Sequence, residues 1–214
     1  MFAVFEHGDI TQFSMGPRWP GNGRLLFNAY LIDGLLIDTG PARFGSSIVR
    51  ACRDKKVLQI VNTSGTSGCI GNNARLQREF SLPIRAHRQA LPMVRQPQSN
   101  LSIPFWEGVW WGRPVPAKGR RIHSWVNTPR YRLRVISAPE RVGHICLYEE
   151  EKGWLFSGTL PIDEGTRLSS LLEGEKINRV FSAWHGVTEG WGAESGVFLR
   201  AGSAADSGRQ NQAG

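Results

Sequence analysis

The sequence predicts an α+β protein in which two β-sheets pack face to face and helices cover the outside. Three observations lead to this fold class: an early apolar hairpin over residues 24–40, alternating helix and strand patterns over 44–94, and a second group of strand patterns between 131 and 183. Sheets and helices bury their apolar faces in a few layered arrangements, and this order of elements suits a two-sheet sandwich.

The hairpin is the clearest local signal. Two apolar, β-rich runs within residues 24–40 flank Asp33-Gly34, and Asp-Gly between such runs is typical of a two-residue hairpin turn. The second run stops at Asp38-Thr-Gly-Pro41, so we expect this strand to end in a polar loop.

Helical and strand patterns then alternate. Residues 44–56 carry apolar side chains at helical spacing and basic side chains near the end, which predicts a helix. Short strands are predicted at 57–61 and 82–86, with a helical turn or two over 87–94. Between these strands lies a glycine-rich loop, after which Asn72 or Asn73 is expected to cap a helix that runs to about Phe80.

The second half predicts another set of strands. Residues 131–137, 143–148 and 153–158 have strand patterns, and a short helix over 166–180 precedes a late strand over 177–183. Residues 96–129 hold many prolines and an aromatic cluster without a sustained period, so we interpret them as an irregular insert or lid. We expect a single domain over 1–200 and a disordered Gly/Ser/Ala/Gln-rich tail over 201–214.

The composition is that of a soluble globular protein, with 214 residues, of which 40% are hydrophobic and 21% charged. No apolar run reaches the ~18–20 residues needed to cross a bilayer. The first nine residues lack the basic and apolar regions of a secretory signal, and the three cysteines form no disulfide pattern. We therefore expect a cytoplasmic protein with no membrane partner.

The basic character of the chain comes from one segment. Residues 80–139 contain ten Arg or Lys and one acid, whereas the rest of the chain has 16 basic and 17 acidic residues. Such a segment attracts phosphates or carboxylates, so nucleic-acid binding through residues 80–139 is one hypothesis. A solvated basic surface without a partner is the other.

Several landmarks together resemble a known family. In chain order they are Asn28-Ala-Tyr-Leu-Ile with Leu36-Ile-Asp-Thr-Gly40, Val61-Asn-Thr followed by Ile70-Gly-Asn-Asn73, Gly143-His-Ile145, Leu155-Phe-Ser-Gly158 and Ala183-Trp-His-Gly186. Over roughly residues 10–190 this series resembles the metallo-β-lactamase fold superfamily of hydrolases. The resemblance implies a four-layer αβ/βα sandwich and a structural role for Asp38.

The resemblance also implies a metal site, and here the sequence departs from the family. Family members hold two metal ions, usually zinc, which activate a hydroxide. Their H-x-H-x-D-H motif is absent. The metal-site positions fall on Ser64, Thr66, Gly68, Cys69, Glu140, Thr159 and His185. Only His185 keeps its ligand type, and His144 matches a histidine that packs or forms hydrogen bonds. A catalytic zinc needs about three protein ligands.

Three functional hypotheses follow from this departure. The first is a degenerate member without the dinuclear zinc site, a pseudoenzyme or binding protein for a small anionic or acyl ligand. The second is a hydrolase of an ester, thioester, lactone or phosphoester, remodelled around Cys69, Glu140 and His185. These three residues would form a makeshift metal site, or Cys69 would act as a nucleophile with a lowered pKa and His185 as its base. The third is nucleic-acid binding.

Overall fold

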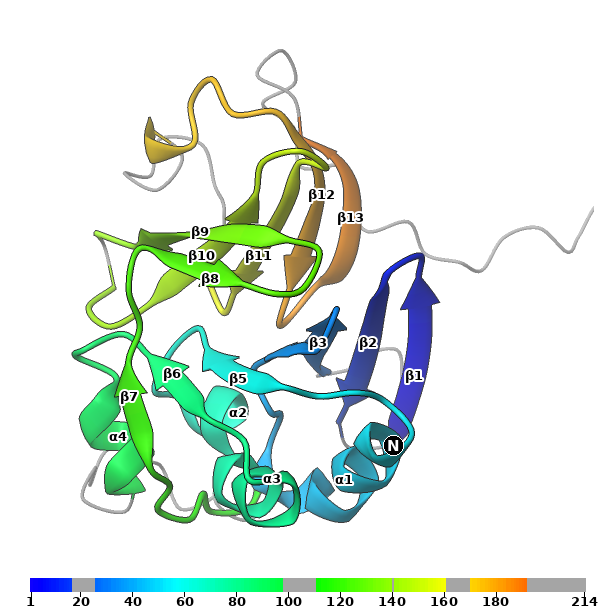
Figure 1. Cartoon of the computed structure of the whole chain (residues 1–214), viewed down its shortest axis with the longest axis vertical. Helices are drawn as coiled ribbons and strands as arrows, with labels where there is room; N and C mark the ends of the chain where they lie inside the picture. The colour runs from blue at the N-terminus through cyan, green and yellow to red at the C-terminus, as the bar shows by residue number, and fades with distance from the viewer. Residues whose placement is uncertain (17–25, 98–110, 140, 161–169, 192–214) are drawn as a thin grey trace, which may run out of the picture.

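The computed structural model describes residues 1–16, 26–97, 111–139, 141–160 and 170–191. These residues form two sheets (Figure 1). The first sheet has the strand order β1 (Phe2–His7), β2 (Ile10–Met15), β3 (Phe27–Ile32), β4 (Leu35–Ile37), β5 (Gln59–Asn62), β6 (Ile84–Ala86) and β7 (Gly119–Arg121). The second sheet has the order β13 (Gly186–Trp191), β12 (Ile177–Ser182), β11 (Trp154–Gly158), β10 (Ile145–Glu149), β9 (Arg132–Ser137) and β8 (Trp125–Asn127).

The helices of the first half lie on the outer side of the first sheet, away from the second sheet (Figure 1). They are the 3₁₀ helix η1 (Ala42–Phe44) and the α-helices α1 (Gly45–Arg53), α2 (Ser67–Ile70), α3 (Asn73–Phe80) and α4 (Leu91–Arg95). Strands β1 to β4 pair antiparallel, and β4 to β7 pair parallel.

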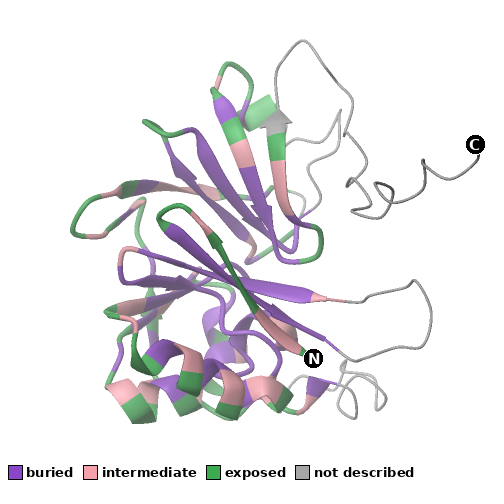
Figure 2. Ribbon diagram, turned by 90° about the vertical axis from the view of Figure 1, so that its right-hand side faces the viewer, coloured by how far each residue is buried: buried purple, intermediate pink, exposed green. Residues whose placement is uncertain are grey.

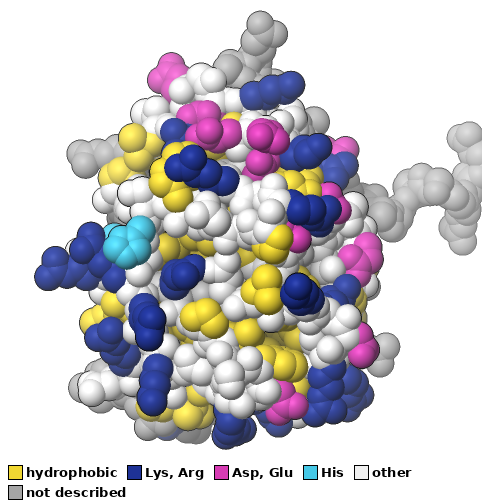
Figure 3. Space-filling view, in the orientation of Figure 1, with side chains coloured by type: hydrophobic (Ala, Val, Ile, Leu, Met, Phe, Trp, Pro, Cys, Tyr) yellow, Lys and Arg dark blue, Asp and Glu magenta, His cyan; other side chains and the backbone are white. Residues whose placement is uncertain are grey.

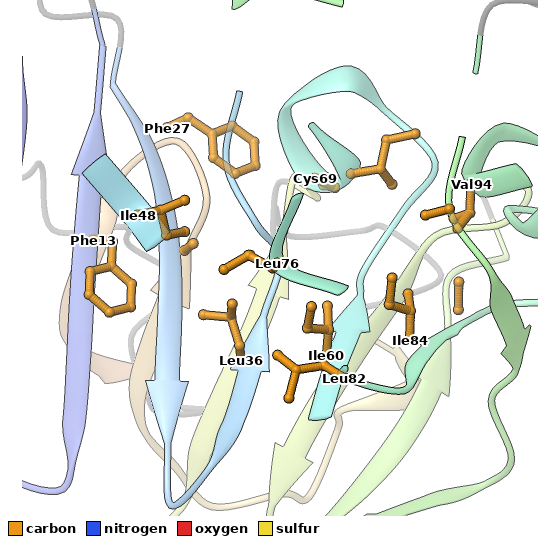
Figure 4. Close-up of a cluster of buried hydrophobic side chains, with 14 of the residues drawn as sticks. Phe13, Phe27, Leu36, Ile48, Ile60, Cys69, Leu76, Leu82, Ile84 and Val94 are labelled. Atoms are coloured by element: carbon orange, nitrogen blue, oxygen red, sulfur yellow. The ribbon is translucent and has the colours of Figure 1, made fainter. Parts of the chain in front are cut away.

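Three apolar cores separate these layers. Side chains alternate between the two faces of a strand, so Leu36 and Ile60 face the helices, whereas Ile37 and Val61 face the second sheet. Figure 4 shows the first of these cores, between the helices and the first sheet. A third core lies on the outer face of the second sheet and includes Leu172. Buried strands therefore lie in the centre and the helices keep an exposed face (Figure 2).

Most predicted elements are confirmed. Asp33 and Gly34 form the two-residue turn, with φ angles of 44° and 85°, and Ile32 pairs with Leu35 across it. The helix predicted over 44–56 is α1, preceded by η1, and the strands predicted at 57–61, 82–86, 131–137, 143–148, 153–158 and 177–183 are β5, β6, β9, β10, β11 and β12. The predicted α+β fold of two packed sheets is thus confirmed.

Two predictions need correction. The segment 96–129 is not irregular throughout, because its described part contains β7 and β8, which are short edge strands rich in exposed polar side chains. Part of the helix predicted over 166–180 belongs to β12, which begins at Ile177. The aromatic cluster at 105–110, residues 161–169 and the tail 201–214 lie outside the described residues. Within the described ranges, no helix has the length and apolar character that a membrane span requires.

Candidate functional site

The corner formed by residues 61–73 lies at one end of the sandwich, where backbone hydrogen bonds join the two sheets. The backbone N–H of Ile145 donates to the carbonyl of Thr63 at 2.8 Å, and the N–H of Asn28 donates to the carbonyl of Ala183 at 2.7 Å. The N–H of Ala183 donates in turn to the carbonyl of Gly158 at 2.7 Å. The ends of β5, β11 and β12 and the start of β10 are therefore held together, and the side chains that follow them face one small volume.

Asp38 holds this corner from the first sheet. Its carboxylate accepts hydrogen bonds from the backbone N–H of Thr63 at 2.8 Å and from the Thr63 hydroxyl at 2.6 Å. Burial raises the pKa of Asp38 to about 7, against the opposing effect of the Thr63 hydrogen bonds. The position takes a left-handed φ of 61°. Asp38 thus performs the loop-binding structural role expected from the sequence.

Asparagine side chains fix the loop and the start of α3. Asn62 donates to the carbonyl of Cys69 at 3.0 Å, and Asn73 donates to the amide oxygen of Asn62 at 2.8 Å. Asn72 occupies the N-cap position of α3, but its side chain donates to the carbonyls of Thr39 and Pro41 instead of capping the helix. The predicted capping bond is therefore replaced by bonds that connect two loops.

Cys69 belongs to the core between the helices and the first sheet (Figure 4) and is fully buried. Its Sγ lies 3.1 Å from the Ser64 hydroxyl, 3.3 Å from that of Thr66 and 3.5 Å from that of Thr63. Burial, and then the charge of Asp38, raise the pKa of this thiol. The expectation of a lowered pKa at position 69 is therefore wrong. The thiol stays protonated at neutral pH, which does not suit a nucleophile.

A pocket of about 220 Å³ opens in front of this corner. Its walls are aromatic side chains from three separate segments: Phe27, Trp111 and Trp184. Its polar surface comprises Thr66, Ser67, Gly68, Arg141, His144 and Thr159. The Thr159 hydroxyl lies 3.2 Å from Nδ1 of His144, and burial, followed by the charge of Arg141, lowers the pKa of His144. The imidazole is accordingly neutral at pH 7.

The structure brings together most of the seven positions identified from the sequence. Thr66, Gly68 and Thr159 line the pocket, and Ser64 and Cys69 lie directly behind Thr66 through their hydrogen bonds. Glu140 lies outside the described residues. His185 is exposed and is not among the lining residues, and its backbone N–H donates to the Ser182 hydroxyl at 3.3 Å. His144, expected to pack or to form hydrogen bonds, lines the pocket.

Sequence reasoning missed Phe27, Trp184 and Arg141 as parts of the pocket. Phe27 precedes the Asn28 landmark by one residue, and Trp184 lies inside the Ala183–Gly186 landmark, so both adjoin residues that were recognised. Their apolar character predicts burial without giving a position, and Trp184 is in fact 39% exposed. Trp111 belongs to the aromatic cluster noted within residues 96–129, whereas Arg141 carries no local signal and reaches the pocket only through the packing of the fold.

The donor set does not fit a zinc or iron site. The described residues contain no cluster of three or more His, Cys, Asp or Glu that is arranged to hold a metal ion. At position 68, where the family has an aspartate, a Cβ atom would lie 2.5 Å from Cε2 of Phe27. The Phe27 ring is fully buried and packs edge-on against Trp184, with centroids 5.3 Å apart. An aromatic pair thus fills the space that a ligand side chain would need.

Comparisons with known proteins identify the fold. No protein-family profile matches the sequence, and the search of curated proteins gives no match. A metallo-β-lactamase from Pontibacter korlensis is similar in structure, with a TM-score of 0.66 and 13% identity, over 88% of this chain and 94% of that one. The protein TTHA1623, solved in a di-iron-bound form, has a TM-score of 0.61 and 23% identity, over 78% and 92% of the two chains.

A third similar structure is the flavodiiron protein from Giardia intestinalis, with a TM-score of 0.57 and 12% identity, over 77% of this chain and 48% of that one. Similarity at these identities concerns the fold and not the activity. The chain therefore has the metallo-β-lactamase fold, which is di-iron-bound in TTHA1623. The described residues of this chain contain no cluster of donors for such a site.

Proposed function

We propose that this protein of the metallo-β-lactamase fold lacks the dinuclear metal site and binds a small organic anion in the pocket that takes its place. The proposal rests on the position of the Phe27 ring, which occupies the space that a side chain at position 68 would need. A lost ligand alone leaves room for a metal, whereas here the room is filled by an apolar group. The corner retains its shape because Asp38 and the asparagines hold it without metal.

The chemistry of the lining supports a carboxylate attached to an apolar body. Arg141 supplies the positive charge, and Thr66, Ser67, Thr159 and His144 supply groups that form hydrogen bonds. Phe27, Trp111 and Trp184 offer flat apolar surface for the rest of the ligand. Ligand pockets usually measure ~300–1,000 Å³, so a pocket of about 220 Å³ suits a ligand of one ring or a short acyl chain.

Metal analysis tests the first part of this proposal. Protein purified without chelators is expected to contain far less than one tightly bound equivalent of zinc or iron per chain, measured by plasma mass spectrometry. Supplementing the growth medium with zinc should not raise this content. Two tightly bound equivalents per chain would contradict the proposal.

Ligand binding tests the second part. We expect benzoate, used as a probe, to raise the melting temperature of the protein. Its neutral counterpart benzamide should leave the melting temperature unchanged, because only benzoate has a negative charge that can pair with Arg141. A ligand present at 100 times its Kd stabilises by about 2.7 kcal/mol. The variant Arg141→Gln should lose the benzoate effect. Arg179→Gln, which removes the same charge on β12, should keep it. Equal responses to benzoate and benzamide would contradict an anion site.

A further inference from the structure

A second and larger hollow lies at the edge strand β7, the opposite edge of the first sheet from β1. It has a volume of about 1090 Å³ and is bounded by α3, the start of β6, the end of α4 and β7. Four exposed cationic side chains converge on it from α3, α4, β7 and the residue before β7: Arg78, Arg95, Arg120 and Lys118. None of its lining residues is acidic. We call this hollow the β7 groove.

The cations of the β7 groove differ from those of the second sheet that pair with acids. On the second sheet, Arg179 pairs with Glu189 and Arg134 pairs with Glu175. No ion pair with an acid is found for the four groove cations among the described residues. Figure 3 shows Lys and Arg side chains along the left-hand side of the molecule, over β7 and α4, without acidic side chains beside them. Their positive potential is therefore directed toward solvent.

The backbone beneath these cations is held in place. Gln77 of α3 donates to the carbonyl of Lys118 at 3.0 Å and accepts from the N–H of Lys118 at 2.9 Å. Arg95 donates to the carbonyl of Gly119 at 3.0 Å, and Arg120 pairs with Arg85 in the parallel ladder. The backbone positions from which these side chains extend are therefore fixed around the groove.

We infer that the β7 groove binds the phosphate backbone of double-stranded nucleic acid without reading its sequence. Arginine side chains match phosphate geometry through two parallel hydrogen bonds, and a polyanion neutralises several unpaired cations at once. The groove lining contains no aromatic side chain on which bases of a single strand would stack. Leu82, Pro83 and Pro116 line it instead, so the charges are its only specific feature.

An acidic peptide added to β7 as a further strand fits this edge less well. β7 has three residues, and two of them are the exposed Arg120 and Arg121. Short edge strands with charged side chains are a common means of blocking strand addition. Individual phosphates contacted by side chains require no continuation of the ladder. The observations therefore favour nucleic acid over a peptide strand.

The inference is tested by salt-dependent binding of a fluorescent duplex of about 20 base pairs, followed by anisotropy. For four phosphate contacts, log Kobs should fall against log[KCl] with a slope of about −3.6, roughly a 150-fold loss of affinity between 50 and 200 mM. Arg78→Gln, Lys118→Gln and Arg120→Gln should each make the slope shallower by about 0.9. Arg179→Gln is the matched control, because it removes the same charge from the second sheet, and it should leave the slope unchanged.

Each alternative result would overturn the inference. An equal effect of Arg179→Gln would mean that net charge, and not the groove, attracts the duplex. Displacement of the duplex by inorganic phosphate at low millimolar concentration would assign the groove to free phosphate. Tighter binding of polyglutamate than of the duplex would assign it to acidic polypeptides. Absence of duplex binding at about 50 mM KCl would exclude a nucleic-acid site altogether.

Discussion

The side chain of Phe27 and the absence of a side chain at Gly68 depend on each other. A Cβ at position 68 would lie 2.5 Å from the ring, which is closer than van der Waals contact allows. We therefore expect Gly68→Asp to lower the free energy of unfolding by about 1–3 kcal/mol through overpacking against the ring. Phe27→Ala should cost about 3–5 kcal/mol because the ring is fully buried.

The double variant distinguishes this steric explanation from general destabilisation. With the ring removed, the aspartate introduced at position 68 gains space and solvent. The double variant should therefore be less destabilised than the sum of the two single variants by about 1–3 kcal/mol. Urea unfolding of the four proteins measures this coupling. Additive costs would show that Phe27 does not exclude a side chain at position 68.

Asp38 makes a second prediction at the level of single residues. Because burial raises its pKa from 3.8 to about 7, the folded state retains a proton that the unfolded state releases. This contribution to stability is complete below about pH 4, decreases as the pH rises, and is lost above about pH 7; its full size is roughly 4 kcal/mol. Asp38→Asn removes the titration, so the stability of the wild type relative to this variant should fall between about pH 4 and pH 8.

Chemical unfolding of both proteins across this range measures the difference. The comparison cancels other titrating groups such as His144, whose lowered pKa acts in the opposite direction. A difference that does not vary with pH would mean that Asp38 is ionised throughout, with Thr63 alone compensating for its burial.

At the level of elements, the end of β11 approaches the first sheet closely. Gly158 has a φ of 59°, and a Cβ there would overlap the Thr63 hydroxyl of the first sheet. Gly158→Ala should therefore cost about 3 kcal/mol or more, combining backbone strain and overpacking. Gly174→Ala is the matched control, since its φ is 84° but no atom lies within 4 Å of the added Cβ.

Gly174→Ala should lower the free energy of unfolding by only about 1 kcal/mol, which is the cost of placing alanine at a positive φ. Thermal or urea unfolding measures both variants. Equal costs would show that the sheets do not meet closely at Gly158. In that case the pocket in front of residues 61–73 would be held by the asparagine hydrogen bonds alone.

The helices and turns that were predicted correctly are those specified by a short stretch of sequence. Asp33-Gly34 specifies its turn by backbone preference, and the helix predicted over 44–56 is specified by its apolar spacing. The hairpin of β1 and β2 was not predicted, since β1 is mostly exposed and β2 buries Thr11, Gln12 and Ser14 through hydrogen bonds. These polar side chains hide the apolar alternation on which strand prediction depends.

The candidate site was predictable only in part, since the sequence identified the loop positions, His144 and Thr159 but not most of the pocket walls. One loop, whose flanking residues resemble a known motif, carries Ser64, Thr66, Gly68 and Cys69. These residues lie close together because they are neighbours in the sequence. Arg141 and the aromatic walls reach the pocket through the packing of two sheets, which no local pattern encodes. The reactivity of Cys69 was also beyond sequence, because burial, and not its place at a helix start, sets its pKa.

At the level of the whole molecule, the sheets are joined at the end opposite the site by a cluster around the turn between β8 and β9. Asp33 accepts from the N–H of Arg130 at 2.6 Å, the Arg130 guanidinium at 3.2 Å and the Thr128 hydroxyl at 2.8 Å. Asp9 accepts from the Tyr131 hydroxyl at 2.6 Å and from Arg130. Turns of the first sheet thus bind a turn of the second.

We expect Asp33→Ala to lower the free energy of unfolding by about 1–3 kcal/mol, because it leaves several donors without an acceptor. Burial acts to raise the pKa of Asp33, but hydrogen bonds from Thr128 and Arg130 lower it overall. The contribution of Asp33 to the free energy of unfolding is therefore present above about pH 4. It is lost as the pH falls through the lowered pKa of this carboxyl group. The exposed Asp54 provides the control, and Asp54→Ala should change stability by less than about 0.5 kcal/mol.

Denaturant unfolding at neutral and acidic pH measures both variants. The two proteins Asp33→Ala and wild type should converge in stability as the pH is lowered. A cost for Asp33→Ala no larger than that for Asp54→Ala would show that the turn cluster does not hold the sheets together.

The filled space at position 68 also restricts how the protein can change through single substitutions. An aspartate introduced first meets the Phe27 ring and destabilises the fold, whereas a smaller residue at position 27 introduced first leaves a hole in the core before any ligand exists to use it. Both orders pass through a less stable protein. A route to a metal-binding corner is therefore blocked at its first step, and the chain is free to vary only around its present pocket.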